Sequence, residues 1–131
     1  MKKGIVLNAD IVEVIAKMGH MDEIVIGDAG LPIPEGVRRI DIALKAGTPS
    51  FVETLETLMS EFICEGAILA KEIQTINPTT ELAIKALLKD IPITYVNHED
   101  FKKQTKSAKA IIRTGECSPY ANIILRSGVF F

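Results

Sequence analysis

The run Glu23-Ile-Val-Ile-Gly27 constrains the fold more than any other part of the chain. Its centre is β-branched and apolar without alternation, which is typical of a strand buried on both faces of a parallel sheet. Helical patterns of ~10 to 13 residues alternate with this run and with further short apolar runs. The sequence therefore predicts an α/β fold, a three-layer α/β/α single domain over residues 1–131 with a mostly parallel, mixed central sheet.

The predicted helices begin at capping residues. We expect Asn8 to cap a helix that ends at Gly19 in the left-handed conformation. Thr48-Pro49 and Asn77-Pro78 each combine a cap with a first-turn proline, and Asn97 predicts a short further helix.

The predicted strands follow from apolar runs and alternation. Besides the central run, they cover residues 37–44, 66–70, 92–96, 110–113, 122–125 and, as a closing segment, 129–131. The last segments follow one another without a helix, so the sheet is expected to be mixed. Because the end Val129-Phe-Phe131 is apolar, we expect it to pack against a neighbouring subunit.

Composition excludes several classes of protein. A net charge of -2 and 5% aromatic residues provide neither the basic surface nor the stacking residues of a nucleic-acid-binding protein. No apolar run approaches the ~20 residues that span a bilayer, and no export signal is recognised, so we expect a cytoplasmic protein without a membrane partner. Cys64 and Cys117 have no metal or redox spacing, and no nucleotide-binding glycine motif or zinc motif occurs.

Asp28 and His20 are the first candidate site residues. Asp28 follows the central strand, at the sheet edge where α/β proteins bind ligands, and the glycine and prolines of 29–34 make the next loop rigid. His20 follows the predicted end of the first helix, where an imidazole can act as a proton donor. We hypothesise that both side chains face one pocket. The alternatives are that His20 complements the helix dipole and that Asp28 stabilises its own turn.

A second polar cluster consists of His98, Tyr120 and Asn122, on loops beside strand ends. The alternative is that each is a solvated loop residue, and Arg113 with Glu116 can form a surface ion pair. Imidazole, carboxylate, phenol and amide groups around a rigid loop suit a small polyhydroxylated ligand. They also suit proton transfer without a cofactor and without a metal.

Several long segments carry a resemblance to a known family. They are Met1-Lys-Lys-Gly4, Leu7-Asn8, Gly19-His20, Asp28-Ala-Gly-Leu-Pro-Ile-Pro34, Arg39-Ile-Asp41 and Ile112-Arg-Thr-Gly-Glu-Cys-Ser-Pro-Tyr-Ala-Asn-Ile-Ile-Leu125. Together they span nearly the whole chain, which resembles the D-ribose pyranase family of the ribose/fucose mutarotase superfamily. The related L-fucose mutarotases share the Gly-His and Gly-Glu elements, but typically not the Ala-Gly-Leu-Pro and Tyr-Ala-Asn versions.

The resemblance implies an isomerase that interconverts the pyranose and furanose forms of β-D-ribose and supplies furanose to a ribokinase. It implies that His20 is the proton donor and that Asp28, His98, Tyr120 and Asn122 bind the sugar, with Lys102 within reach of the site. It also implies a homodecamer with sites at subunit boundaries. Two alternatives stay open: a non-catalytic sugar-binding or regulatory protein, and an L-fucose-type mutarotase.

Overall fold

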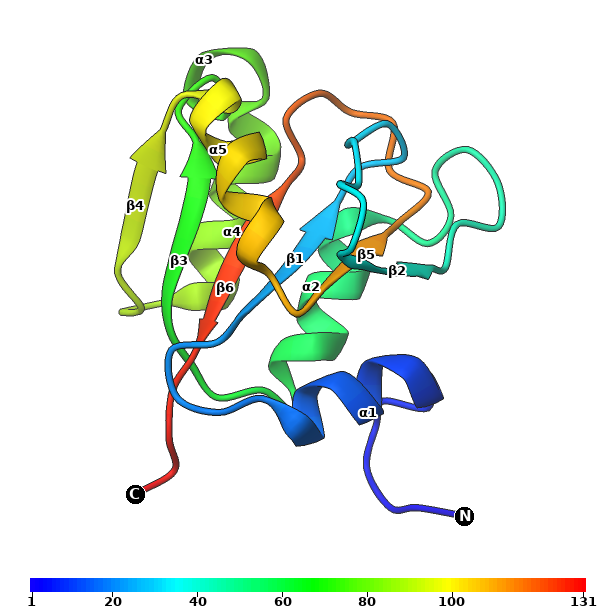
Figure 1. Ribbon diagram of the computed structural model, residues 1–131. Coiled ribbons are helices and arrows are strands. Elements are labelled where there is room, and N and C mark those ends of the chain that lie inside the picture. Colours follow the sequence, from blue (N-terminus) through cyan, green and yellow to red (C-terminus); the bar gives the residue numbers. More distant parts are fainter.

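The computed structural model describes residues 1–131 as one six-stranded sheet with helices on both faces (Figure 1). The strands are β1 (Glu23–Gly27), β2 (Arg38–Asp41), β3 (Cys64–Ala70), β4 (Ile93–Val96), β5 (Ala110–Arg113) and β6 (Ile123–Ser127), in the order β2-β5-β1-β6-β3-β4. The helices are α1 (Ala9–Lys17), α2 (Phe51–Met59), α3 (Ile73–Ile76), α4 (Pro78–Leu88), α5 (His98–Gln104) and the 3₁₀-helix η1 (Thr105–Ser107).

The sheet is mixed, and the predicted α/β fold is confirmed. Strand β6 runs antiparallel to both of its neighbours, β1 and β3, whereas the other pairs are parallel. A loop, and not a helix, connects β5 to β6, so the chain returns in the opposite direction.

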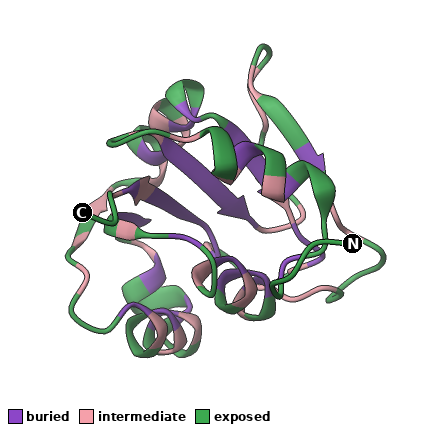
Figure 2. Cartoon of the chain, turned by 90° about the horizontal axis from the view of Figure 1, so that it is seen from below, coloured by how far each residue is buried: buried purple, intermediate pink, exposed green.

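Strand β1 separates two hydrophobic cores. Ile24 and Ile26 face the larger core, which α1, α2 and α4 cover, whereas Val25 faces a smaller core with Phe101 of α5. All five residues of β1 are buried, as predicted, and Figure 2 shows buried strands between helices whose outer faces are exposed. Each fully buried isoleucine contributes roughly 1.5–3 kcal/mol of transfer free energy.

Two predicted helix boundaries are wrong. Helix α1 ends at Lys17 with Met18 extended, and the left-handed conformation falls on Met21 (φ 73°) rather than on Gly19. Helix α2 begins after Ser50, whose hydroxyl accepts the Glu53 N–H, so the helix starts later than predicted. The caps at Asn8, Asn77 and Asn97 are confirmed.

The end of the chain also differs from its prediction. Residues 129–131 form no strand, because pairing ends with β6 at Ser127. Phe130 and Phe131 are 88% and 95% exposed. Strand β2 is shorter than predicted, since it covers Arg38–Asp41 of the expected residues 37–44.

Candidate functional site

Asp28 lies at the carboxyl edge of the sheet, meaning the edge where the parallel strands end. It follows Gly27, the last residue of β1, which is paired with Arg113 of β5. Its Oδ1 accepts the Gly30 N–H at 2.9 Å, so the turn-stabilising alternative applies. A carboxylate has about four acceptor positions, and Asp28 therefore keeps capacity for ligand hydroxyls.

Asn122 fixes Asp28 through two hydrogen bonds. The Asn122 Oδ1 accepts the Asp28 N–H at 2.8 Å, and the Asn122 Nδ2 donates to Asp28 Oδ2 at 3.0 Å. Asn122 is buried, with 1% of its surface exposed, whereas Asp28 is partly exposed. A Cβ on Gly27 would come within 3.2 Å of Asn122 Oδ1, so glycine allows this close approach. The structure thus shows Asn122 supporting Asp28, and direct sugar contact by Asn122 stays a prediction.

A cavity of about 330 Å³ opens beside Asp28, at the lower end of the usual size of small-molecule sites. Its lining residues are Asp28, Gly30, Leu31, Pro32, His98, Pro119 and Tyr120. The rings of His98 and Tyr120 meet edge to face, with centroids 5.0 Å apart and an 86° interplanar angle. Three of the predicted sugar-binding residues therefore line one cavity.

His98 reaches the cavity as the first residue of α5. The Asn97 side chain caps this helix by accepting the Asp100 N–H at 2.8 Å. The backbone N–H of His98 donates to Oε2 of Glu72 at 2.8 Å. The ring stacks on Phe101, with centroids 6.3 Å apart, and its Nδ1 is buried without a partner.

Long-range hydrogen bonds hold the loops around the cavity. Arg113 donates from Nε to the Ala29 carbonyl at 3.0 Å and pairs with Asp41 at 3.0 Å. The side-chain amide of Asn77 donates to the Pro119 carbonyl at 2.8 Å, next to Tyr120. Because these bonds form within the chain, the loop shape is set without a ligand.

The predicted ion pair between Arg113 and Glu116 is wrong. Glu116 instead accepts the backbone N–H groups of Phe51, at 3.0 Å, and Ser118, at 3.2 Å. Burial acts to raise the pKa of the Glu116 carboxyl, but these hydrogen bonds outweigh it and lower the pKa below its ordinary value of 4.5. Glu116 therefore fastens the loop before Tyr120 to the start of α2.

His20 lies at the opposite end of β1, which we call the amino edge of the sheet. Its Nε2 lies 2.9 Å from Oε2 of Glu65, near the start of β3, and not beside Asp22 or Asp28. Five strand residues at ~3.3 Å each separate His20 from Asp28 by roughly 16 Å or more. The hypothesis that both face one pocket is therefore wrong within a single chain. The His20 side chain is 54% exposed.

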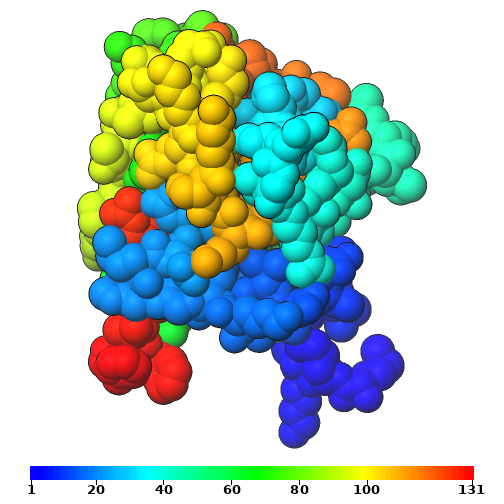
Figure 3. Space-filling view, viewed as in Figure 1, coloured from blue at the N-terminus to red at the C-terminus, as the bar shows by residue number.

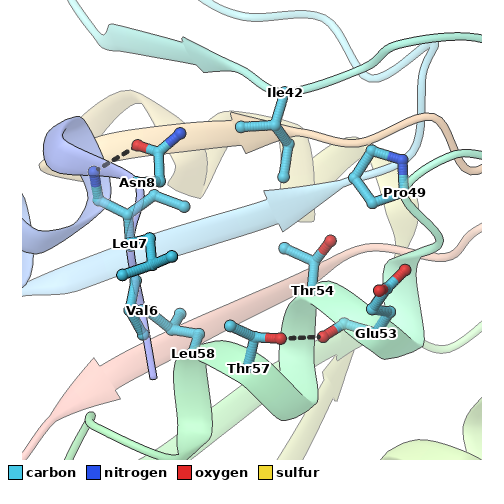
Figure 4. A pocket seen from close by; sticks show the side chains of 10 residues that line it. Val6, Leu7, Asn8, Ile42, Pro49, Glu53, Thr54, Thr57 and Leu58 are labelled. Carbon is cyan, nitrogen blue, oxygen red and sulfur yellow. Dashed lines mark hydrogen bonds between the residues drawn. The ribbon is translucent and has the colours of Figure 1, made fainter. Parts of the chain in front are cut away.

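Two other hollows lack the predicted combination of groups. One, of about 260 Å³, lies between the N-terminal segment and α2, and Glu53 is its one titratable lining residue (Figure 4). Another, of about 370 Å³, shares Pro32 with the candidate cavity and is lined by Lys102, Lys103 and Lys106. Lys102 pairs with Glu99 there, at 2.8 Å, so it borders the candidate cavity without lining it.

Comparisons with known proteins identify the family of the chain. The model of the RbsD / FucU transport protein family matches residues 1–130. The chain belongs to this family. A D-ribose pyranase from Geobacillus thermodenitrificans is 53% identical over all 131 residues and 99% of that protein. Another, from Clostridium perfringens, is 50% identical over the full length of both chains.

Two solved structures show the same fold. The structure of Bacillus subtilis RbsD complexed with D-ribose has a TM-score of 0.98 and 47% identity, and each chain is covered completely. A fucose mutarotase from Streptococcus pneumoniae, in complex with L-fucose, has a TM-score of 0.78 and 29% identity over both full chains. No helix of the present chain combines the length and the apolar character needed to cross a bilayer.

Sequence reasoning missed the long-range contacts of four polar residues that shape the two edges. Glu65 contacts His20, Glu72 holds the His98 N–H, Asn77 holds the Pro119 carbonyl, and Glu116 holds the Phe51 N–H. Each bond joins residues at least 26 positions apart, so no local pattern reveals it. Asn77 carried a signal, its cap before Pro78, and that signal indicated one of its two roles. Glu116 was considered as a partner of Arg113, which is not the contact it makes.

Proposed function

We propose that the chain is a D-ribose pyranase, an isomerase that interconverts the pyranose and furanose forms of β-D-ribose without a cofactor. The observation that carries the proposal is the carboxyl-edge cavity, in which Asp28, His98 and Tyr120 converge. The full-length relatives named D-ribose pyranase support the same reaction. One domain over residues 1–131 is proposed to do this work, and its product would suit a kinase that uses the furanose.

The cavity residues are suited to holding a sugar in both its cyclic form and its open-chain form. Asp28 accepts hydrogen bonds from hydroxyls, Tyr120 donates or accepts through its phenol, and His98 contributes one ring nitrogen. Asn122 acts through Asp28, which it holds in place. Fixed hydroxyls limit rotation of the open chain, so that ring closure uses a hydroxyl already near the carbonyl carbon.

The proton donor must come from outside the cavity's own chain. His20 is half-exposed at the amino edge, where Glu65 is the one hydrogen-bond partner of its imidazole. We assign it to the cavity of a neighbouring copy, in a homo-oligomer that the resemblance suggests is a decamer. Figure 3 shows the C-terminal end protruding below the segment that contains His20, and the exposed Phe130 and Phe131 would be covered by such packing.

The reaction needs one acid and one acceptor. His20 protonates the ring oxygen as the anomeric hydroxyl loses its proton, and the ring opens to the aldehyde. After rotation, a different hydroxyl attacks the carbonyl carbon and gives its proton to the imidazole, while the carbonyl oxygen takes back the proton that the acceptor held and becomes the new anomeric hydroxyl. Glu65 orients the ring of His20 for both steps. We place this activity in the cytoplasm, which suits the free thiols of Cys64 and Cys117.

Exchange spectroscopy by NMR on equilibrated ribose tests the proposal. We expect catalytic amounts of the protein to accelerate pyranose–furanose exchange, and His20→Ala to abolish the acceleration without unfolding the chain. Binding of ribose with no acceleration would instead support a sugar-binding protein. L-Fucose in the same experiment tests the fucose alternative, since faster exchange with fucose than with ribose would reverse the assigned preference.

A further inference from the structure

His20 and Glu65 form a hydrogen-bonded pair at the amino edge of the sheet. The Nε2 of His20 lies 2.9 Å from Oε2 of Glu65, and the imidazole has no other hydrogen bond within the chain. The two side chains are 54% and 35% exposed. Many exposed pairs contribute nothing measurable, because both long side chains are free to move. This pair differs from them, because the backbone on both of its sides is fixed.

The turn that carries His20 is tied to strand β6. Within the turn, Asp22 Oδ2 accepts the Gly19 N–H at 2.8 Å, and Met21 takes the left-handed conformation. Across to β6, the Met21 N–H donates to the Ser127 carbonyl at 2.9 Å, and the Ser127 N–H donates to the Asp22 carbonyl at 2.8 Å. His20 therefore projects from a turn whose position is set by β6.

Strand β6 fixes the backbone of Glu65 from its other side. In the ladder between β3 and β6, two steps along β3, from Cys64 to Gly66, match one step along β6. Glu65 is the extra residue, and it forms a β-bulge, a feature that re-aims side chains and is common beside active sites. A Cβ on Gly128 would come within 3.3 Å of Glu65 Cβ and 3.6 Å of its Oε2. Glycine at this position therefore leaves room for the carboxylate.

The contact decides which nitrogen of His20 is free. An ionised carboxylate only accepts hydrogen bonds, so the imidazole nitrogen that faces Glu65 carries a proton in the neutral ring as well as in the charged ring. The hydrogen bond of one ring nitrogen sets the tautomer of the whole ring. With Nε2–H bonded to Glu65, Nδ1 is the nitrogen that gains and loses a proton.

We propose that Glu65 is a positioning residue that holds the Nε2–H of His20, so that Nδ1 is the atom that exchanges a proton with the sugar. In ring opening, the Nδ1 proton passes to the ring oxygen and leaves a neutral imidazole whose Nε2–H is still bonded to Glu65. In ring closure, Nδ1 takes the proton of the attacking hydroxyl. The role of Nδ1 rests on the proposed function, whereas the bond between Nε2–H and Glu65 does not.

Nitrogen-15 NMR of the histidine rings tests the bond without any measurement of activity. The chain has two histidines, and the signals that disappear in His20→Gln belong to His20. At a pH of about 8, where an ordinary imidazole is neutral, we expect wild-type His20 to be the Nε2–H form alone. In Glu65→Ala, we expect a mixture with the Nδ1–H form, so that the two nitrogen shifts move toward each other.

Asp22→Asn is the matched control for this spectrum. It removes a carboxylate two residues from His20, while its amide oxygen replaces the carboxylate as acceptor of the Gly19 N–H. The nitrogen shifts of His20 should not change. A wild-type ring with its proton on Nδ1 would overturn the proposal, and so would nitrogen shifts that Glu65→Ala leaves unchanged.

Incorporation of Nδ1-methylhistidine at position 20 tests which atom acts on the sugar. The methyl group blocks Nδ1 and leaves Nε2–H to bond with Glu65. In protein of wild-type assembly size, we expect ribose exchange to fall to the level of His20→Ala, a loss of about 10²–10⁴-fold. Ribose exchange at the wild-type rate would show that Nε2 transfers the proton and would overturn the assignment.

Kinetics supply a further readout of the positioning role. We expect Glu65→Ala to lower kcat about 10²-fold, the cost of a misplaced catalytic group, and to change KM less than about twofold. In a His20→Ala background, Glu65→Ala should have no further effect, because Glu65 acts through the imidazole. Additive losses would overturn this role. If the nitrogen shifts behave as expected but the wild-type protein does not accelerate ribose exchange, the pairing stands and the proposed function fails.

Discussion

The two edges of the sheet differ in how completely a single chain builds them. At the carboxyl edge, Asp28 has two bonds to Asn122 and one to the turn, and loops from distant parts of the chain enclose a cavity. At the amino edge, the His20 side chain is 54% exposed and hydrogen-bonds only to Glu65. The C-terminal tail at this edge carries two exposed phenylalanines.

Under the proposed function, this difference separates ligand binding from proton donation. Groups that must hold a sugar in one geometry need fixed partners, and the carboxyl edge supplies them within the chain. A proton donor that acts on a neighbour must instead project from the surface. We therefore expect variants at the carboxyl edge to affect folding and binding together, and variants at the amino edge to affect catalysis without folding.

The largest effect is expected for His20→Ala. Loss of the proton donor should lower the catalysed ribose exchange by about 10²–10⁴-fold. Because the side chain is half-exposed, the free energy of unfolding should change by less than about 0.5 kcal/mol. NMR exchange rates and urea unfolding measure the two quantities, and ribose exchange at the wild-type rate would remove His20 from the mechanism.

The next effect concerns Asn122→Ala at the carboxyl edge. The change leaves the Asp28 N–H and one Asp28 carboxylate oxygen without their partner, which should destabilise the fold by roughly 2–4 kcal/mol. Ribose affinity, measured by calorimetry, should fall with it. Asn8→Ala is the control: loss of the α1 cap should cost about 1 kcal/mol and leave affinity unchanged. Equal ribose affinities of the two variants would refute a special role for the carboxyl edge.

A smaller, pH-dependent effect is expected for Glu116. The folded state lowers the pKa of the Glu116 carboxyl below its ordinary value of 4.5. The carboxylate therefore stabilises the fold fully above that ordinary, unfolded-state value, and this contribution disappears as pH falls through the folded pKa. Glu116→Gln should therefore lower stability at pH 7, by about 1 kcal/mol at most after solvent screening, and by less near pH 3. Melting curves across this range provide the test, and a constant difference would be inconsistent with it.

Removal of Phe130 and Phe131 should have the smallest effect on the chain itself. Both side chains are exposed, so the free energy of unfolding should change by less than about 0.5 kcal/mol. Analytical ultracentrifugation should nevertheless show a smaller assembly if the tail packs on a neighbour. An assembly of unchanged size would mean that the amino edge docks without its tail.

Local sequence patterns predict what local physics decides. The burial of β1 and the caps at Asn8, Asn77 and Asn97 follow from neighbouring residues, and the structure confirms them. Gly19 shows the limit, because the Asp22 carboxylate accepts its N–H at 2.8 Å and Met21 takes the left-handed conformation instead.

The candidate site shows the same limit at longer range. The rule for the carboxyl edge of α/β sheets placed Asp28 correctly, and His98 and Tyr120 line the same cavity. His20 was assigned to this pocket because it is close to Asp28 in the sequence, whereas a fully extended strand separates the two. The roles of Glu65 and Glu72 depend on pairs 45 and 26 residues apart, which only the folded chain brings together.

Subunit complementation tests most directly whether His20 of one copy serves the cavity of another. Two inactive variants, His20→Ala and Asp28→Asn, would be unfolded, mixed in equal amounts and refolded together. Sites shared between copies predict that about one cavity in four combines an intact Asp28 with a neighbour's intact His20, so that a corresponding fraction of ribose exchange activity returns. A refolded mixture of normal assembly size that remains as inactive as either variant alone would contradict the account.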